Sequence, residues 1–280
     1  MSVKLIIDSS SDISKSEADS LGITMIPMLI TIGDKEYYDG VDITPQEFYE
    51  KLEQEKSLPK TAQVTPFRFE DVFEKVTSDG SEAIAIVLSS KLSGTCAGAK
   101  LASEKFNGKV FVVDSLNATV GERLLIEYAL TLIDKGWTAK KIYEELEQVK
   151  SKIVLMGALD TLEYLKKGGR ISSATAFIGG MLNIKPIVHL VSGEVKMLAK
   201  ARGNKKSYEF MNNVLKDKPI DFTMPYGVLW TGTDDSNAKK YIEDSNSLWQ
   251  GYSCPKHYVV GSTIGTHVGP GVVGIAYFKK

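Results

Sequence analysis

The chain has few of the residues that would indicate a metal centre or a disulfide framework. Its 280 residues include only two cysteines, Cys96 and Cys254, and three histidines. None of these residues lies at the spacing of a metal-ligating pair. Isolated thiols are typical of a reducing compartment, where disulfides are rare. We therefore expect no metal, no cofactor and a cytoplasmic location.

The sequence also lacks a long apolar run and an excess of charge of either sign. No segment approaches the roughly 18 apolar residues that would span a bilayer, and the first residues, MSVKLIIDSSSD, do not resemble a signal peptide. The chain has 34 Lys and Arg residues against 35 Asp and Glu residues, a net charge of -1. With this balance the protein has no excess positive charge to attract it to nucleic acid or to an anionic membrane. Any lipid chemistry would then take place in solution.

Apolar residues are abundant enough for a large core, at 43% of the chain. In the first half, short apolar runs are each followed by a segment of helical period, which is typical of βαβ units with parallel strands. These runs are VKLIID, AIAIVLSS and KVFVVDS. Between the first two we expect a hairpin with Gly33 and Asp34 in its turn, and two helices that open at Thr44-Pro45 and Thr65-Pro66.

The pattern changes after Ile153. IVLMGAL and IKPIVHLVSGEVKMLAKAR predict strands on either side of a small-residue helix, ISSATAFIGGMLN. Further strands are expected at PYGVLW, around 256–262 and over 271–278. The predicted fold class is α/β with two α/β domains, a ligand being held between them. Residues 1–151 would carry a mostly parallel sheet, and residues 152–280 a mixed sheet.

Small polar residues follow the expected parallel strands of the first domain. Asp8 and Ser9 follow the first strand, SSKLSGT follows the second, and Asp114 and Ser115 follow the third. Ligands of open α/β sheets bind at the carboxyl ends of the strands, where helix N-termini offer main-chain N–H groups to anions. Ser and Asp are also the preferred helix caps, so each residue has a structural alternative. Together they favour an anion-binding edge.

Ser93 and His267 fit two different functions. SSKLSGT lacks the spacing of a phosphate loop, so the Ser93 hydroxyl and the N–H groups of Gly94 and Thr95 are expected to hold an oxyanion. His267 lies among glycines that leave room for a ligand, and a structural glycine-rich turn explains the same pattern. The alternative function is a serine hydrolase of acyl esters with Ser93 as nucleophile and His267 as base. The sequence has no G-x-S-x-G elbow for it.

A set of motifs in a fixed order identifies a family. They are DSSSDI, TAQVTP at 61–66, SSKLSGT at 89–95, VVDSLNATVG, LEYLKKGGRISSATAFIGGMLNIKPIVHL, GEVKMLAKARGNKKS and IGTHVGPG. This set resembles the DegV family of bacterial fatty-acid-binding proteins. The resemblance implies a carrier, not an enzyme, with one long-chain fatty acid in a buried tunnel and its carboxylate at the domain interface. In some members a separate ATP-dependent fatty acid kinase phosphorylates the bound acid, so a kinase is an implied partner.

The resemblance also implies which residues hold the ligand. Thr61, Ser93 and Gly94 would bind the carboxylate from the first domain, and Arg202 and His267 from the second. The walls of the acyl-chain pocket are expected in and around the small-residue helix, at Ile171, Phe177, Ile178, Met181, Leu182 and Ile184. The chain departs from the family at Ala62, where serine is common. It also has Ser173 and Ala174 where members thought to dock a kinase carry basic residues.

Overall fold

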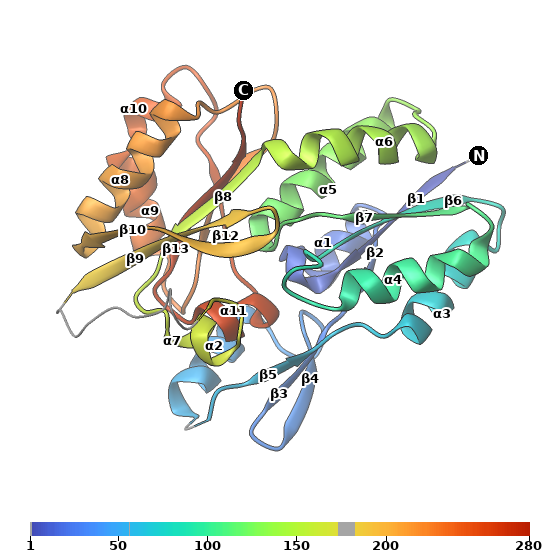
Figure 1. Ribbon diagram of the computed structural model, residues 1–280, viewed down its shortest axis with the longest axis horizontal. Helices are drawn as coiled ribbons and strands as arrows, with labels where there is room; N and C mark the ends of the chain where they lie inside the picture. The colour runs from blue at the N-terminus through green and yellow to red at the C-terminus, as the bar shows by residue number, and fades with distance from the viewer. Residues whose placement is uncertain (1, 56, 173–182) are drawn as a thin grey trace.

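The first sheet of the protein is parallel, as the sequence predicts. The computed structural model describes residues 2–55, 57–172 and 183–280 (Figure 1). Within these ranges the first sheet has the strand order β2-β1-β6-β7, and each of its pairings is parallel. Its strands are β1 (Val3–Asp8), β2 (Thr24–Ile26), β6 (Glu82–Val87) and β7 (Val110–Asp114).

Helices bury both faces of this sheet, which explains its uninterrupted apolar strands. In β6, Ile84 and Ile86 face one apolar cluster, whereas Ala83 and Ala85 face another. The helices on the two faces are α3 (Pro66–Thr77) and α4 (Thr95–Ser103) on one side, and α5 (Thr119–Asp134) and α6 (Ala139–Val149) on the other. Shorter segments nearby are α1 (Lys15–Ser20), η1 (Ser9–Ser11), η2 (Glu104–Phe106) and η3 (Lys150–Lys152).

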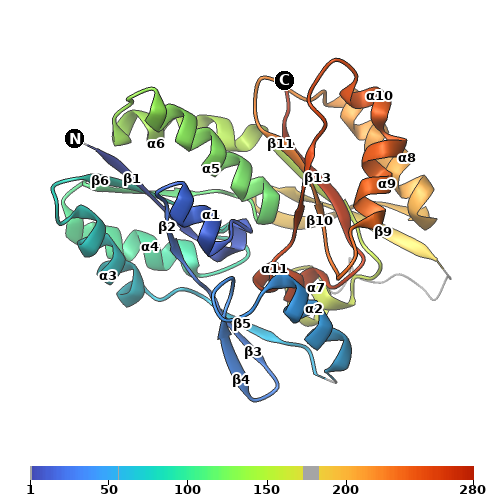
Figure 2. The ribbon, with the colours of Figure 1, turned by 180° about the vertical axis from the view of Figure 1, so that it is seen from behind.

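The second sheet is mixed, which is also as expected. Its order is β10-β9-β8-β13-β11-β12, and among the described strands the β11–β12 pairing is parallel and the others antiparallel. The strands are β8 (Ile153–Ala158), β9 (Ile184–Val191), β10 (Glu194–Arg202), β11 (Tyr226–Trp230), β12 (Lys256–Val259) and β13 (Val273–Phe278). One face carries α8 (Gly203–Asp217), α9 (Ser236–Asp244) and α10 (Asn246–Trp249), as Figure 2 shows. Each strand follows residue 152; the domain boundary itself stays a prediction.

Helix α5 lies between the two sheets and joins their cores. It contacts β1 and β6 on one side and β8, β11 and β13 on the other. One apolar cluster accordingly includes Ile7 and Val113 from the first sheet, Leu125 from α5, and Leu229 and Phe278 from the second sheet. The N-terminal end of α5 therefore reaches the junction between the two halves of the molecule.

A small third sheet lies below this junction in Figure 1. Its order is β4-β3-β5, and both pairings are antiparallel. The strands are β3 (Leu29–Ile32), β4 (Lys35–Tyr38) and β5 (Lys60–Ala62). The hairpin turn at Gly33 is confirmed, with φ of 58° at that glycine. The strand β5 was not expected, and it places Thr61 opposite Ile30.

Three short helices complete the region around the third sheet. They are α2 (Pro45–Gln54), α7 (Glu163–Lys167) and α11 (Ser262–Val268). α2 begins at Pro45, as predicted, behind a capping box formed by Thr44 and Glu47. A structural glycine-rich turn is one interpretation of the segment around His267, but the structure has helix α11 there. The expected small-residue helix falls mostly on 173–182, outside the described residues.

Candidate functional site

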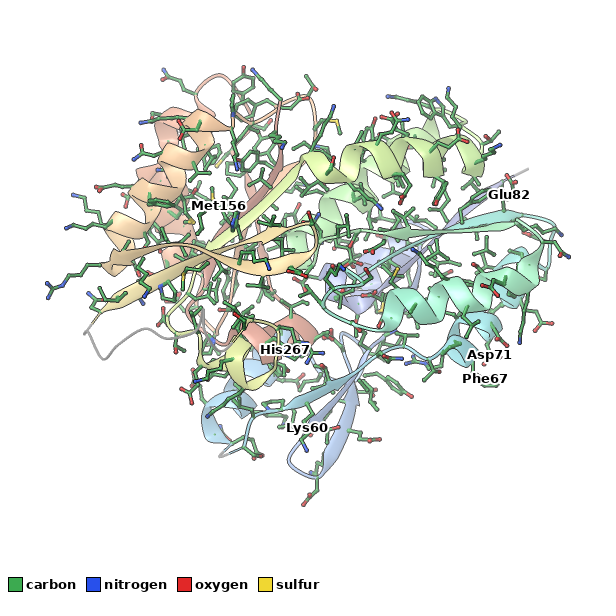
Figure 3. The ribbon with its side chains drawn as sticks, viewed as in Figure 1. Lys60, Phe67, Asp71, Glu82, Met156 and His267 are labelled. Atoms are coloured by element: carbon green, nitrogen blue, oxygen red, sulfur yellow. The ribbon has the colours of Figure 1, made fainter. Side chains whose placement is uncertain are left out.

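A cavity of about 260 Å³ lies between the two large sheets, beside the N-terminal end of α5. Its volume is close to the lower end of the range for small-molecule pockets. Both halves of the chain supply its predominantly apolar walls, which include Leu88, Leu92, Leu155, Val188, Leu190 and Val195. Met156 of β8 also lines the cavity, and Figure 3 labels it on the second sheet, above His267 on α11. Such walls suit a ligand that is mostly hydrocarbon.

Polar side chains gather where the cavity approaches the third sheet. Four residues that the sequence places at the head group, Thr61, Ser93, Gly94 and His267, all line the cavity. They come from β5, from the loop before α4 and from α11. Residues far apart in the chain are thus brought to one place; their role in binding a carboxylate stays a prediction.

His267 and Thr61 form the centre of this polar cluster. His267 Nε2 lies 2.9 Å from Thr61 Oγ1, whereas the buried Nδ1 has no hydrogen-bond partner among the described residues. A Cβ atom on Gly168 would lie 2.3 Å from Nδ1, so this glycine makes room for the ring. We assign the proton to Nε2, because an unpaired buried N–H is rarer than an unpaired acceptor. Nε2–H then donates to Thr61, whose own hydroxyl proton is available to a ligand.

His267 is held in its neutral form. Burial, and to a lesser extent the positive charge of Arg170, lower the pKa of His267 to about 4. Removing a cation from water disfavours the charged imidazolium, and a neighbouring cation disfavours it further. At neutral pH His267 is therefore a neutral hydrogen-bond donor, and it supplies no positive charge to the cavity.

Arg170 supplies the positive charge, and sequence reasoning did not assign it a role. Its Nε donates to the Leu92 carbonyl at 3.2 Å and its Nη1 to the Gly168 carbonyl at 2.5 Å. Partial burial lowers the pKa of its guanidinium, although arginine stays charged in proteins. The signal was present in the sequence, since Arg170 follows two glycines in LKKGGRIS, a motif that the family resemblance already includes.

Arg202, expected at the head group, is not at this cavity. It is exposed at the end of β10, the edge strand of the second sheet, next to the start of α8. Ile184, its neighbour on β9, is half-buried and does not line the cavity either. Ile171 is buried in the shared core and is not on the cavity wall. The other expected wall residues, Phe177, Ile178, Met181 and Leu182, lie outside the described residues.

The loop that carries Ser93 is organised by its own hydrogen bonds. Ser93 Oγ accepts from the Thr95 N–H at 3.2 Å and lies 2.9 Å from Thr95 Oγ1. One of the N–H groups expected to bind an oxyanion is therefore already used. A Cβ on Gly94 would lie 1.9 Å from Gln63 Oε1, so glycine is needed for Gln63 to lie across the loop. Gln63 also lines the cavity and was missed by the sequence analysis.

The two residues of the hydrolase alternative are not arranged as a nucleophile and its base. Within the part of the chain that the structure describes, the hydrogen-bond partner of His267 Nε2 is Thr61 and Nδ1 has none, so neither nitrogen pairs with Ser93 or with a carboxylate. A catalytic serine needs both an adjacent base and a group that orients that base. The site as it stands can hold an oxyanion, but it does not activate a hydroxyl.

A second cavity of about 600 Å³ lies on the other side of the head-group residues. Thr61, Arg170 and His267 line both cavities and so form the wall between them. The second cavity also has Lys60 and Lys167 on its walls, and Figure 3 shows Lys60 below His267. An apolar interior space and a basic outer space therefore meet at Thr61, Arg170 and His267.

The other polar residues of the expected anion-binding edge have structural roles. Asp8 accepts from the main-chain N–H groups of Ser10 and Leu88, and Asp114 accepts from that of Leu116. The bond from Ser10 makes Asp8 the cap of η1, which matches the capping alternative. The bonds from Leu88 and Leu116 hold the chain after β6 and β7. Over the described part of the chain, no group of three or more His, Cys, Asp and Glu residues could hold a metal ion. In the same ranges, no helix is long and apolar enough to cross a membrane.

Comparisons with known proteins agree over the whole chain. A sequence model described as "Uncharacterised protein, DegV family" matches residues 2–280. A DegV domain-containing protein of Caldanaerobacter subterraneus subsp. tengcongensis is 32% identical over 99% of both chains. A DegV family protein from Thermus thermophilus, described for its fatty acid binding, has a TM-score of 0.90 at 29% identity and 100% coverage of both chains. DegV from Bacillus subtilis, described as a fatty acid binding protein, has a TM-score of 0.85 at 29% identity, again with 100% coverage of both. The chain belongs to the DegV family.

Proposed function

We propose that the protein binds one long-chain fatty acid, with the acyl chain in the apolar cavity and the carboxylate beside Thr61, Ser93, Arg170 and His267. One observation carries the proposal: the apolar cavity ends at a cluster of neutral hydrogen-bonding groups next to a guanidinium. The DegV proteins from Thermus thermophilus and Bacillus subtilis, described as binding fatty acids, support it. The head group would then lie at the interface of the two domains.

The two parts of such a ligand contribute differently to binding. Each buried methylene contributes about 0.8 kcal/mol, so roughly fourteen of them contribute on the order of 11 kcal/mol before the costs of association. A hydrogen bond to a charged head group adds about 1.5 to 3 kcal/mol net. The acyl chain therefore supplies most of the affinity, and the head group sets which end of the ligand meets Thr61.

A carboxylate removed from water needs charge-assisted hydrogen bonds. The guanidinium of Arg170 supplies the charge, and the hydroxyls of Thr61 and Ser93 supply donors. Neutral His267 strengthens the Thr61 donor, because a hydroxyl that accepts a hydrogen bond becomes a better donor in turn. A bound carboxylate would also raise the pKa of His267 from its value of about 4.

We further propose that the protein is a carrier and not an enzyme, and that it works in the cytoplasm. Support for the first point comes from His267, whose nitrogens pair with neither Ser93 nor a carboxylate. Support for the second comes from Cys96 and Cys254, which are both free thiols.

Lipid extraction followed by titration tests the function. Protein purified from a bacterial host should release about one fatty acid per chain on extraction with organic solvent, identified by mass spectrometry. The delipidated protein should then bind palmitate at least about tenfold more tightly than hexadecanol, because the alcohol cannot make charge-assisted bonds. An absence of saturable palmitate binding would contradict the proposal. Labelling of Ser93 by a fluorophosphonate, with release of acid from an acyl ester, would establish the hydrolase instead.

A separate fatty acid kinase is the partner that we propose for the loaded protein. The basic outer cavity, with Lys60, Lys167 and Arg170 beside the head-group residues, would favour the phosphate groups of such a reaction. The expected result is formation of acyl phosphate when loaded protein, ATP and a bacterial fatty acid kinase are mixed. Failure of several such kinases to phosphorylate the bound acid would contradict the kinase partnership, but not fatty acid binding.

A further inference from the structure

The helix that carries His267 is held at its N-terminus by a distant side chain. Gly261, the residue before α11, makes no side-chain cap. The carboxylate of Asp39 takes its place. Asp39 Oδ1 accepts from the N–H and the hydroxyl of Ser262, at 3.1 and 2.9 Å, and Oδ2 from those of Thr263, at 3.3 and 2.6 Å. A negative charge at a helix N-terminus also favours the helix dipole.

Both carboxylate oxygens of Asp39 are hydrogen-bonded, and the side chain is buried. Its Oδ2 accepts a further bond from Ser9 Oγ at 3.0 Å, and the residue is 3% exposed. Ser9 Oγ in turn accepts from the N–H of Met28 at 3.0 Å. A carboxylate buried to this extent is stable only when its oxygens are paired, so these donors and Asp39 depend on each other.

Asp39 belongs to the same small sheet that carries Thr61. It follows β4 directly, and its N–H donates to the Met28 carbonyl at 2.9 Å, just before β3. β3 pairs with β5, where Thr61 lies. The bonds of Asp39 therefore fix the start of α11 relative to the strand that holds Thr61, and His267 lies in the last turn of that helix.

The middle of α11 is also fitted closely against the first half of the chain. A Cβ on Gly265 would lie 2.6 Å from Tyr49 Oη and 2.8 Å from Phe48 Cε1, so the helix rests directly on α2. Tyr49 Oη donates to the Val260 carbonyl at 3.0 Å. These contacts leave α11 little freedom to slide, while Asp39 fixes its N-terminal end.

We propose that Asp39 is a positioning residue for the fatty acid head group: it seats α11 on the third sheet so that His267 Nε2 meets Thr61. Asp39 does not line the cavity, and it acts through Ser262 and Thr263. This inference rests on the proposed function, because it assumes that the pair of His267 and Thr61 serves a carboxylate.

Asp39→Asn in the full-length protein tests the proposal. The variant keeps the shape but replaces one acceptor oxygen by an N–H₂ donor that faces the Thr263 and Ser9 donors. We expect the preference for palmitate over hexadecanol to fall about tenfold, with hexadecanol affinity unchanged. In the ligand-free variant the His267 pKa, followed by NMR titration of its ring, should rise above about 4 as the ring gains water.

Two further variants complete the experiment. Asp42→Asn is the matched control, because Asp42 is an exposed carboxylate of the same loop and accepts from the Tyr38 N–H. In this variant the preference for palmitate over hexadecanol and the pKa of His267 should match those of the wild type. Ser262→Ala removes one donor to Asp39 and should shift both readouts in the same direction by a smaller factor, about threefold for the preference. If Asp39→Asn does not fold, the ligand preference and the His267 pKa of Ser262→Ala test the proposal in its place.

The outcomes separate this inference from the proposed function. An equal loss of palmitate and hexadecanol affinity, with the His267 pKa unchanged, would reduce Asp39 to a fold-stabilising residue and overturn the proposal. Unchanged values in both Asp39→Asn and Ser262→Ala would overturn it too. If wild-type protein fails to prefer palmitate, the proposed function is wrong, and the His267 pKa in the ligand-free variants still shows whether Asp39 positions the ring.

Discussion

At the scale of single residues, the proposed head-group site divides charge and hydrogen bonding between two side chains, Arg170 and His267. Arg170 keeps its charge and is held by the carbonyls of Leu92 and Gly168. His267 is neutral because burial and the charge of Arg170 lower its pKa to about 4. Among the described residues that line the apolar cavity, the site therefore presents one cationic side chain, Arg170, and a set of neutral donors, which suits a carboxylate.

The first residue-scale prediction compares two arginines. Arg170→Ala should weaken palmitate binding by about 1.5 to 3 kcal/mol, because a charge-assisted partner of the carboxylate is lost. Hexadecanol binding should change much less. Arg202→Ala is the control, since Arg202 is exposed at the end of β10, and its affinity for both ligands should equal that of the wild type. Calorimetric titration at about pH 8, where the ligand is ionised, measures both. Weaker palmitate binding by Arg202→Ala, with unchanged binding by Arg170→Ala, would show that Arg202 binds the carboxylate instead.

The same two arginines show why sequence reasoning found only part of the site. Thr61, Ser93 and His267 lie in motifs whose residue types match the role proposed for them, and the structure brings them to one cavity. Arg170 and Arg202 each adjoin a glycine near an apolar run, so local sequence does not distinguish them. Only the fold places Arg170 beside the cavity and Arg202 at the rim of a sheet.

At the scale of elements, strong local signals led to correct predictions and tertiary contacts explain the failures. β1, β6 and β7 have uninterrupted apolar runs, and α2 and α3 open with Thr-Pro, so their positions could be predicted. β5 has no such signal in its three residues and becomes a strand because β3 offers it an edge.

Helix α11 is the clearest example of an element that its own sequence does not specify. It is seven residues long, contains Gly265, and follows a glycine that makes no side-chain cap. Isolated helices of this length are unstable in water. The cap comes from Asp39, 223 residues earlier than Ser262 in the chain. No local pattern could reveal such a bond.

At the scale of the whole molecule, buried acids beside α5 make stability depend on pH. Ser10 Oγ lies 2.5 Å from Asp8 Oδ1 and 2.8 Å from Glu122 Oε2, and it has one proton to donate. One carboxyl must therefore carry a proton of its own. We assign this proton to Glu122, because its Oε1 has no hydrogen-bond partner in the described ranges. Burial, and then the charge of Asp8, raise the pKa of Glu122 well above its ordinary value.

This proton gives the sign of the pH dependence. Below about pH 4.3, Glu122 is protonated in both the folded and the unfolded chain, so its ionisation does not change the free energy of unfolding. As the pH rises toward the raised folded pKa, the unfolded chain releases the proton first. The free energy of unfolding then falls by up to about 1.4 kcal/mol per pH unit.

Glu122→Gln tests this whole-molecule property, because glutamine can donate to Ser10 at every pH. The variant should be more stable than the wild type at about pH 8, and the difference should shrink toward about pH 5. Urea unfolding at several pH values measures it. Glu104→Gln makes the same charge change at an exposed position and should show no such trend. A constant difference between Glu122→Gln and wild type would mean that Glu122 is ionised in the folded protein.

The contact between Thr61 and His267 also sets an order of events during synthesis. These residues are 206 positions apart, and β13, which follows α11, inserts between β8 and β11. A growing chain on the ribosome can pair the strands of its first sheet early, but the far wall of the cavity and the helix with His267 arrive last. An incomplete chain therefore lacks part of the cavity wall, including His267. Under the proposed function, loading with a fatty acid would begin only with finished molecules, and truncated products would not compete with them for lipid.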